Sequence, residues 1–82
     1  MIQPEHIRMA KAALNWSNND LAKLAGLHKN TISNAENGKA KESTLLLLEM
    51  LFEKGDETHY IEFLAEDEHG GPGIRLNKHQ TS

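Results

Sequence analysis

The spacing of Ala22, Gly26 and Ile32 constrains this chain more than any other feature. Alanine lets two helices cross closely, glycine permits a tight turn between them, and the isoleucine points from the second helix into a core. Ser17 can cap the first of these helices, and Asp20 can complete a capping box with it. The pattern predicts two short crossed helices joined at the glycine. A plain three-helix core could carry the same spacing by chance.

Apolar residues at helical spacing predict four helices in all. The first begins at Pro4, whose missing N–H costs nothing in a first helical turn. The fourth begins at a cap supplied by Ser43 or Thr44 and ends at Gly55. The predicted helices cover about residues 4–14, 18–25, 29–36 and 45–54. The last is apolar nearly all round, so it must be buried on more than one side.

The C-terminal third predicts a different kind of structure. Residues 59–64 are rich in aromatic and β-branched side chains, and residues 73–77 alternate apolar with polar ones, so each segment predicts a strand. The polar, glycine-rich residues 65–72 predict a turn between them. We therefore expect a mainly α fold: a four-helix domain over 1–55, a short two-stranded β extension over 56–78 and a disordered tail over 79–82.

Charge is divided unevenly along the chain. Residues 1–41 hold six Lys and Arg against three Asp and Glu, whereas residues 42–82 hold three against nine, within a net charge of −3. A basic half can meet a polyanion, while an acidic half can face water or a protein. Ordinary surface scatter can produce the same asymmetry, so charge alone does not decide between these interpretations.

Several classes of function are disfavoured by what the sequence lacks. Without cysteine it has no disulfide, thiolate metal site or thiol nucleophile. Its five histidines include no i, i+4 pair of the kind that holds zinc on a helix. The longest apolar run, Leu45 to Leu48, is far too short to span a membrane, and the N-terminus does not resemble a signal peptide. We expect a cytoplasmic, non-enzymatic protein that binds no metal, no cofactor and no membrane.

The stretch from Asn18 to Lys39 resembles the XRE (Cro/lambdoid repressor-like) helix-turn-helix family. The ending Ile-Ser-x-x-Glu-Asn-Gly-Lys over residues 32–39 is especially typical of that family. The resemblance covers about residues 5–55, and the C-terminal strands are similar to those of a subgroup of small bacterial and prophage XRE regulators. It implies that the helix over residues 29–36 enters the major groove of DNA. Glu36 is expected to make a structural hydrogen bond rather than to touch DNA.

The resemblance also implies which residues contact DNA. Lysine can donate to guanine O6 and N7, and asparagine can pair with adenine N6 and N7, although an ordinary solvated helix face carries similar residues. The implied base contacts are Lys29, Asn30 and Asn34, with Ser33 and His28 as lesser candidates. Phosphate contacts are expected from a helix N-terminus and from the loop after the third helix. The implied residues there are Asn18, Thr31, Asn37, Lys39 and Lys41.

A single module of this size covers too little DNA for selective binding, so a homodimer on an inverted repeat is expected. The apolar fourth helix and the two strands are the expected dimer material, because strands from two subunits could pair into one sheet. A hairpin folded back within one chain is the alternative. The expected interface residues are Leu48, Phe52, Tyr60, Ile61, Phe63, Ile74 and Leu76.

These expectations lead to two candidate functions. The first is a sequence-specific transcriptional regulator of bacterial or phage origin, a dimeric autorepressor that occupies its operator on double-stranded DNA. A regulator of a neighbouring phage operon, such as an anti-CRISPR operon, makes the same DNA-binding prediction. The second is an antitoxin, which binds a partner protein (a toxin) through its acidic C-terminal half and represses its own operon.

Overall fold

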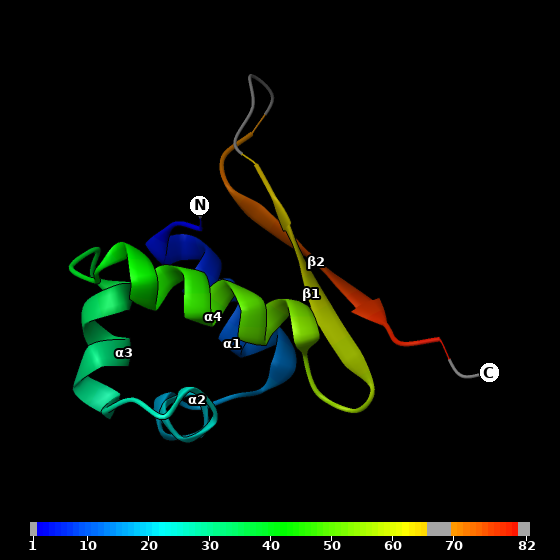
Figure 1. The fold of residues 1–82 in the computed structure, drawn as a ribbon. Coiled ribbons are helices and arrows are strands. Elements are labelled where there is room, and N and C mark those ends of the chain that lie inside the picture. Colours follow the sequence, from blue (N-terminus) through cyan, green and yellow to red (C-terminus); the bar gives the residue numbers. More distant parts are fainter. Residues whose placement is uncertain (1, 66–69, 81–82) are drawn as a thin grey trace.

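A computed structural model describes residues 2–65 and 70–80 of the chain. Four helices are followed by an antiparallel β-hairpin (Figure 1), so the fold is mainly α, as predicted. The elements are α1 (Pro4–Leu14), α2 (Asn18–Ala25), α3 (Lys29–Glu36), α4 (Glu42–Lys54), β1 (His59–Leu64) and β2 (Gly73–Lys78). The helix α4 crosses the molecule, with α3 beside its N-terminal end and the hairpin beside its C-terminal end (Figure 1).

The helix α4 begins earlier than its sequence signals suggested. Its N-cap is Lys41, which makes no side-chain capping bond, so the predicted caps Ser43 and Thr44 lie inside the first helical turn. The acidic Glu42 in that turn interacts favourably with the positive end of the helix dipole. The expected start near residue 45 was therefore too late, because the short connection from α3 leads the chain directly into the helix.

The core lies between the helices and one face of the hairpin. Its largest fully buried side chains come from every element except β2: Phe52, Ile7, Leu21, Ile32, Leu48 and Ile61. Trp16 stacks on the ring of Phe52, with centroids 5.6 Å apart, and Phe63 meets the same ring edge-on at 6.1 Å. Aromatic pairs of this geometry stabilise a fold beyond their buried area. Trp16 thus anchors the core.

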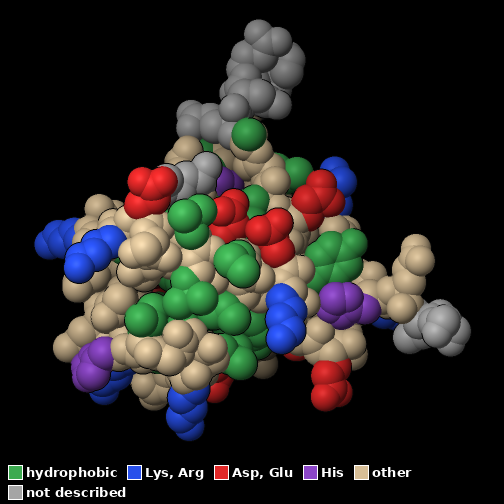
Figure 2. Space-filling model, in the orientation of Figure 1, with side chains coloured by type: hydrophobic (Ala, Val, Ile, Leu, Met, Phe, Trp, Pro, Cys, Tyr) green, Lys and Arg blue, Asp and Glu red, His purple; other side chains and the backbone are tan. Residues whose placement is uncertain are grey.

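Leu48, Phe52 and Ile61 correct the expected dimer interface. All three are at most 1% exposed and are covered by residues of their own chain, so they support the fold from within and do not face a partner. Tyr60, Phe63 and Ile74 are half-buried. Leu76 is 44% exposed, as are Leu46 (46%) and Met50 (68%) of α4. Figure 2 shows hydrophobic side chains gathered on the molecular surface over α4.

The hairpin forms within one chain and is attached to α1 by a buried histidine. Its register pairs His59 with Lys78 and Leu64 with Gly73. His6 is only 4% exposed; its Nδ1 accepts the Gln3 backbone N–H at 2.9 Å, and its Nε2 donates to the Leu64 carbonyl at 3.0 Å. This pair of bonds defines a neutral tautomer and connects the start of α1 to the end of β1. The hairpin is therefore packed against the helical domain.

Two details concern the ends of the hairpin. Gly55 precedes it at φ 71°, where an added Cβ would lie 1.9 Å from the His59 carbonyl oxygen, so only glycine fits this junction. The tail was expected to be disordered from residue 79, but the His79 backbone N–H donates to the Thr58 carbonyl at 2.9 Å and its ring lies against Tyr60. Residues 81–82, and residues 66–69 of the predicted turn, lie outside the described residues.

Candidate nucleic-acid interface

The helices α2 and α3 meet at the glycine turn that the sequence indicated. Gly26 has φ 68° and ends α2 in the left-handed region, and an added Cβ there would have no atom within 4 Å. Glycine is therefore required for its backbone conformation, not because a side chain would collide with a neighbour. Ala22 is 7% exposed and Ile32 is fully buried. The packing of these two buried side chains holds α3 at a fixed angle against α2.

The outer face of α3 carries the four residues of this helix to which base contacts were assigned. Lys29, Asn30, Ser33 and Asn34 are all exposed. At about 100° per residue they lie on one side of the helix, opposite the buried Ile32 and Ala35. An α-helix is about 10–12 Å across with its side chains, which suits a major groove about 12 Å wide. The helix thus presents a polar, protruding face with donors and acceptors.

His28 performs a structural task that its sequence position did not reveal. Its ring Nδ1 accepts the backbone N–H of Asn30 at 3.1 Å and so caps the start of α3. In the neutral ring the proton then resides on Nε2. Because His28 is exposed, that N–H can donate to an acceptor on a ligand while Nδ1 holds the helix start.

A partly buried polar cluster joins α1, α2 and α3. The Lys11 ammonium contacts the Glu36 carboxylate and donates to the Asn18 side-chain oxygen; the Lys11 and Glu36 side chains are 15% and 16% exposed. Arg8 donates to the Glu36 carbonyl at 2.6 Å. The expected structural role of Glu36 is confirmed. Its pairing with Lys11 removes a negative charge that would otherwise repel a polyanion near the end of α3.

The same cluster qualifies the expectation for Asn18. Its oxygen is engaged by Lys11, so the side-chain NH₂ is the group left to donate to a phosphate. Sequence reasoning assigned no role to Lys11, because a lysine 25 positions from Glu36 carries no local signal. Only the packing of α1 against α3 brings the two together.

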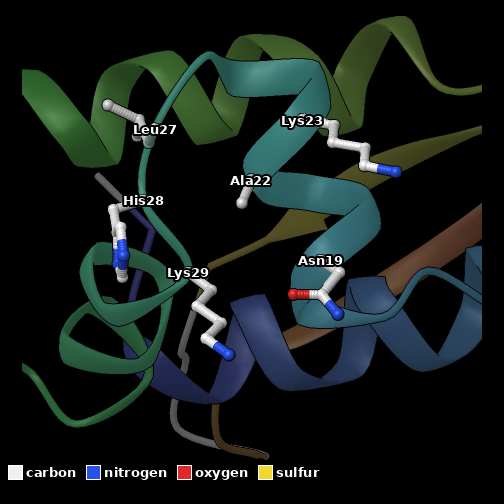
Figure 3. A pocket seen from close by; sticks show the side chains of 6 residues that line it. All are labelled: Asn19, Ala22, Lys23, Leu27, His28 and Lys29. Atoms are coloured by element: carbon white, nitrogen blue, oxygen red, sulfur yellow. The ribbon is translucent and has the colours of Figure 1, made fainter.

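A pocket between α2 and the start of α3 adds a residue that sequence analysis missed. It is lined by Asn19, Ala22, Lys23, Leu27, His28 and Lys29 (Figure 3). Lys23 is exposed on α2 and lines the pocket together with Lys29, with its ammonium end pointing outward from α2 (Figure 3). A helical lysine three residues before a glycine turn has no distinctive pattern, so its place beside α3 follows only from the fold.

The loop after α3 supplies the remaining basic residues. Asn37, Lys39 and Lys41 are exposed, whereas Thr31 is half-buried. Gly38 has φ 76°, whereas Asn37 has φ −103°. The Lys39 backbone N–H donates to the Asn34 carbonyl at 2.8 Å. This bond fixes the loop to the end of α3, beside its exposed face.

Two helices crossed at a glycine turn, with a polar second helix exposed between basic residues, define a helix-turn-helix DNA-binding protein. A family model, HTH_3 (Helix-turn-helix), matches residues 7–55. The chain belongs to this XRE-type helix-turn-helix family, and it is a DNA-binding transcription regulator. The family is generally non-enzymatic. No curated protein and no solved structure matches the chain significantly.

Two further observations concern the described residues. Over 2–65 and 70–80, no helix is long and apolar enough to cross a membrane. In the same part of the chain, no three histidine or acidic side chains gather in a way that could hold a metal ion.

The capping box of α2 makes stability depend on pH. The Asp20 carboxylate accepts the Ser17 N–H at 2.9 Å, and this bond, followed by one from the Ser17 hydroxyl, lowers the pKa of Asp20. Because the folded pKa lies below the unfolded one, the stabilisation is present above the ordinary Asp pKa of about 4 and is lost as pH falls through the lowered value. We expect Asp20→Asn to lower the free energy of unfolding at pH 7, and this deficit to shrink below about pH 4.

Urea denaturation at several pH values measures this effect. Glu57→Gln is the matched control, because Glu57 is an exposed residue of the α4–β1 loop. A deficit for Asp20→Asn that stayed constant between pH 7 and pH 3 would contradict the assignment.

Proposed function

We propose that the protein is a sequence-specific regulator that binds an inverted-repeat operator as a homodimer and represses transcription, including that of its own gene. The observation that carries this proposal is the exposed polar face of α3, formed by Lys29, Asn30, Ser33 and Asn34. In this proposal the face enters the major groove, where lysine and asparagine side chains distinguish base pairs. His28 adds a donor at the helix start.

The surrounding residues supply the contacts that fix the protein on the DNA backbone. We assign phosphate contacts to Asn18, Thr31, Asn37, Lys39 and Lys41, and add Lys23. Such contacts position the protein without reading sequence. Each phosphate neutralised releases counterions, so affinity falls as salt concentration rises. Residues 1–55 carry DNA binding in this proposal. Residues 56–78 complete the core through Ile61.

Binding to DNA from the protein's own promoter region tests the proposal. Purified protein is titrated against this DNA at two salt concentrations, with random DNA as competitor, and the complex is footprinted. We expect selective binding that protects two half-sites about 34 Å apart, with affinity lower at the higher salt concentration. Binding no tighter than to random DNA would contradict sequence-specific regulation.

A second candidate function uses the opposite end of the molecule. The hairpin lies away from α3 (Figure 1); it presents the exposed Leu76 on one face and an ion pair between Arg75 and Glu62 on the other. An antitoxin would bind its partner protein here while α3 stays available for DNA. A toxin-like reading frame beside the gene, and a stable complex of the two purified proteins that Leu76→Glu weakens, would support this function. Absence of any such neighbouring frame would favour the plain regulator.

A further inference from the structure

The outer face of α4 is apolar and uncovered. Leu46 and Met50 lie one helical turn apart and are 46% and 68% exposed. Figure 2 shows hydrophobic side chains gathered over this helix, with acidic side chains along one border. An isolated exposed leucine is common, but two large apolar residues on one helix face beside further apolar surface indicate a site of association.

Charged residues on the two flanks of this face differ in sign. At about 100° per residue, Glu42 and Glu53 fall on one side of the line from Leu46 to Met50, and Lys54 falls on the other. Glu49 lies on the same flank as Glu42 and Glu53. Because Glu49 lines a pocket together with His6 of α1 and Phe63 of β1, it shows which way this flank faces. The acidic flank therefore faces α1 and the hairpin, and the flank with Lys54 faces away from them.

The two ends of α4 also differ. The five-residue connection from α3 leads into its N-terminus, and the hairpin follows its C-terminus after four residues. Figure 1 shows α3 beside the first end and the hairpin beside the second. A partner on the outer face of α4 therefore leaves the exposed face of α3 uncovered.

We propose that this outer face is a homodimer seam in which two copies of α4 lie side by side and parallel, related by a twofold axis along the helices. The inference rests on the proposed function. In this arrangement Leu46 meets Leu46 and Met50 meets Met50 of the second copy, and the acidic flank of each helix faces the flank of the other that carries Lys54. Both copies of α3 then lie at the same end of the dimer, where a single DNA segment reaches them.

An antiparallel arrangement of the two α4 helices is disfavoured both by the charges and by the position of α3. A twofold axis across the helices brings each flank against the same flank of the other copy, so Glu42 and Glu53 face like charges, which is destabilising. It also places the two α3 helices at opposite ends of the dimer. A second copy in parallel avoids facing the two acidic flanks against each other and keeps both α3 helices at one end of the dimer.

Cysteine cross-linking distinguishes the parallel from the antiparallel seam, because the chain contains no cysteine of its own. Two variants, Leu46→Cys and Met50→Cys, are oxidised separately and as an equal mixture. A disulfide needs Cα atoms about 4.4–6.8 Å apart, so we expect each variant to cross-link with itself and the mixture to yield little of the mixed species. Cross-linking confined to the mixed species would overturn the parallel seam.

Two charge substitutions test the location of the seam. Sedimentation measures the dimer fraction of Met50→Glu and of Leu76→Glu, a matched control on the exposed surface of β2, and circular dichroism verifies that both fold. We expect Met50→Glu to raise the dissociation constant at least tenfold and Leu76→Glu to leave it within about twofold of the wild type. A Met50→Glu protein as dimeric as the wild type, or a wild type that is monomeric at every concentration tested, would overturn the seam.

These measurements are made without DNA, so their outcome is separate from that of operator binding. Wild-type protein that dimerises through α4 but does not prefer its promoter DNA would support the seam and contradict the proposed regulator function. Protein that selects its operator yet dimerises through the hairpin would support the regulator function and contradict the seam.

Discussion

Replacing Lys29 and Asn34 together by alanine is expected to abolish operator preference while the protein stays folded. Both side chains lie on the exposed face of α3 and are exposed themselves, so their removal leaves Ile32 and Ala35 in the core. A good bidentate contact to a base is worth about 1–3 kcal/mol of discrimination. Losing two reduces the ratio of operator to random-DNA affinity by roughly 30-fold to 10⁴-fold. Competition titration with promoter and random DNA measures this ratio.

A second double variant distinguishes base recognition from contacts to the DNA backbone. Lys39→Ala with Lys41→Ala removes two exposed charges from the loop after α3 without touching its polar face. These residues are proposed to contact phosphates, so affinity should fall alike on operator and random DNA. The dependence on salt should become shallower by about one unit for each phosphate that is no longer neutralised. If the Lys29→Ala, Asn34→Ala protein kept its operator preference, α3 would not be the reading helix.

Phe52→Ala is expected to cost the domain a large part of its stability. Phe52 is fully buried, and its ring lies against Trp16 on one side and Phe63 on another. Truncating a buried phenylalanine costs about 3–5 kcal/mol, because apolar surface is no longer buried and a cavity remains. Small domains have only about 5–15 kcal/mol of stability in total. Chemical denaturation of the two proteins measures the difference in the free energy of unfolding.

The expected loss also reports whether the hairpin belongs to the same cooperative unit. Phe52 connects α4 to Trp16 and to β1, so the helices and the hairpin should unfold in one transition. Leu24→Ala is the control, because Leu24 is 54% exposed on α2 and its truncation is expected to cost less than about 0.5 kcal/mol. A Phe52→Ala variant within about 1 kcal/mol of the wild type would show that this ring does not hold the core together.

Much of the fold could be predicted because its signals are local. Ser17 and Asp20 cap α2 through bonds three residues apart, and Gly26 ends it with a positive φ. Both strands were predicted from their residues, and the structure places β1 at His59–Leu64 and β2 at Gly73–Lys78, within one residue of the expected bounds. Each of these features depends on chain neighbours and on the intrinsic conformational preference of one residue.

The contacts that the polar groups of the interface make could be found only from the tertiary structure. Lys11 reaches Asn18 and Glu36 only because α1 packs against both helices, and Lys23 borders the pocket near Lys29 only because α2 lies beside α3. The DNA-contact residues themselves remain predictions. Their exposure on one face of α3 agrees with the proposed role.

The apolar residues of α4 show most clearly the difference between what local sequence predicts and what depends on packing. The sequence predicts that α4 is a helix apolar nearly all round, but four consecutive leucines contain no polar residue to mark which side faces inward. The tertiary structure decided this: Leu48 and Phe52 pack in the core, while Leu46 and Met50 face outward. A helical pattern depends on residues up to four positions away, whereas the burial of a face depends on which distant elements cover it. For α4 those are α2 and the hairpin.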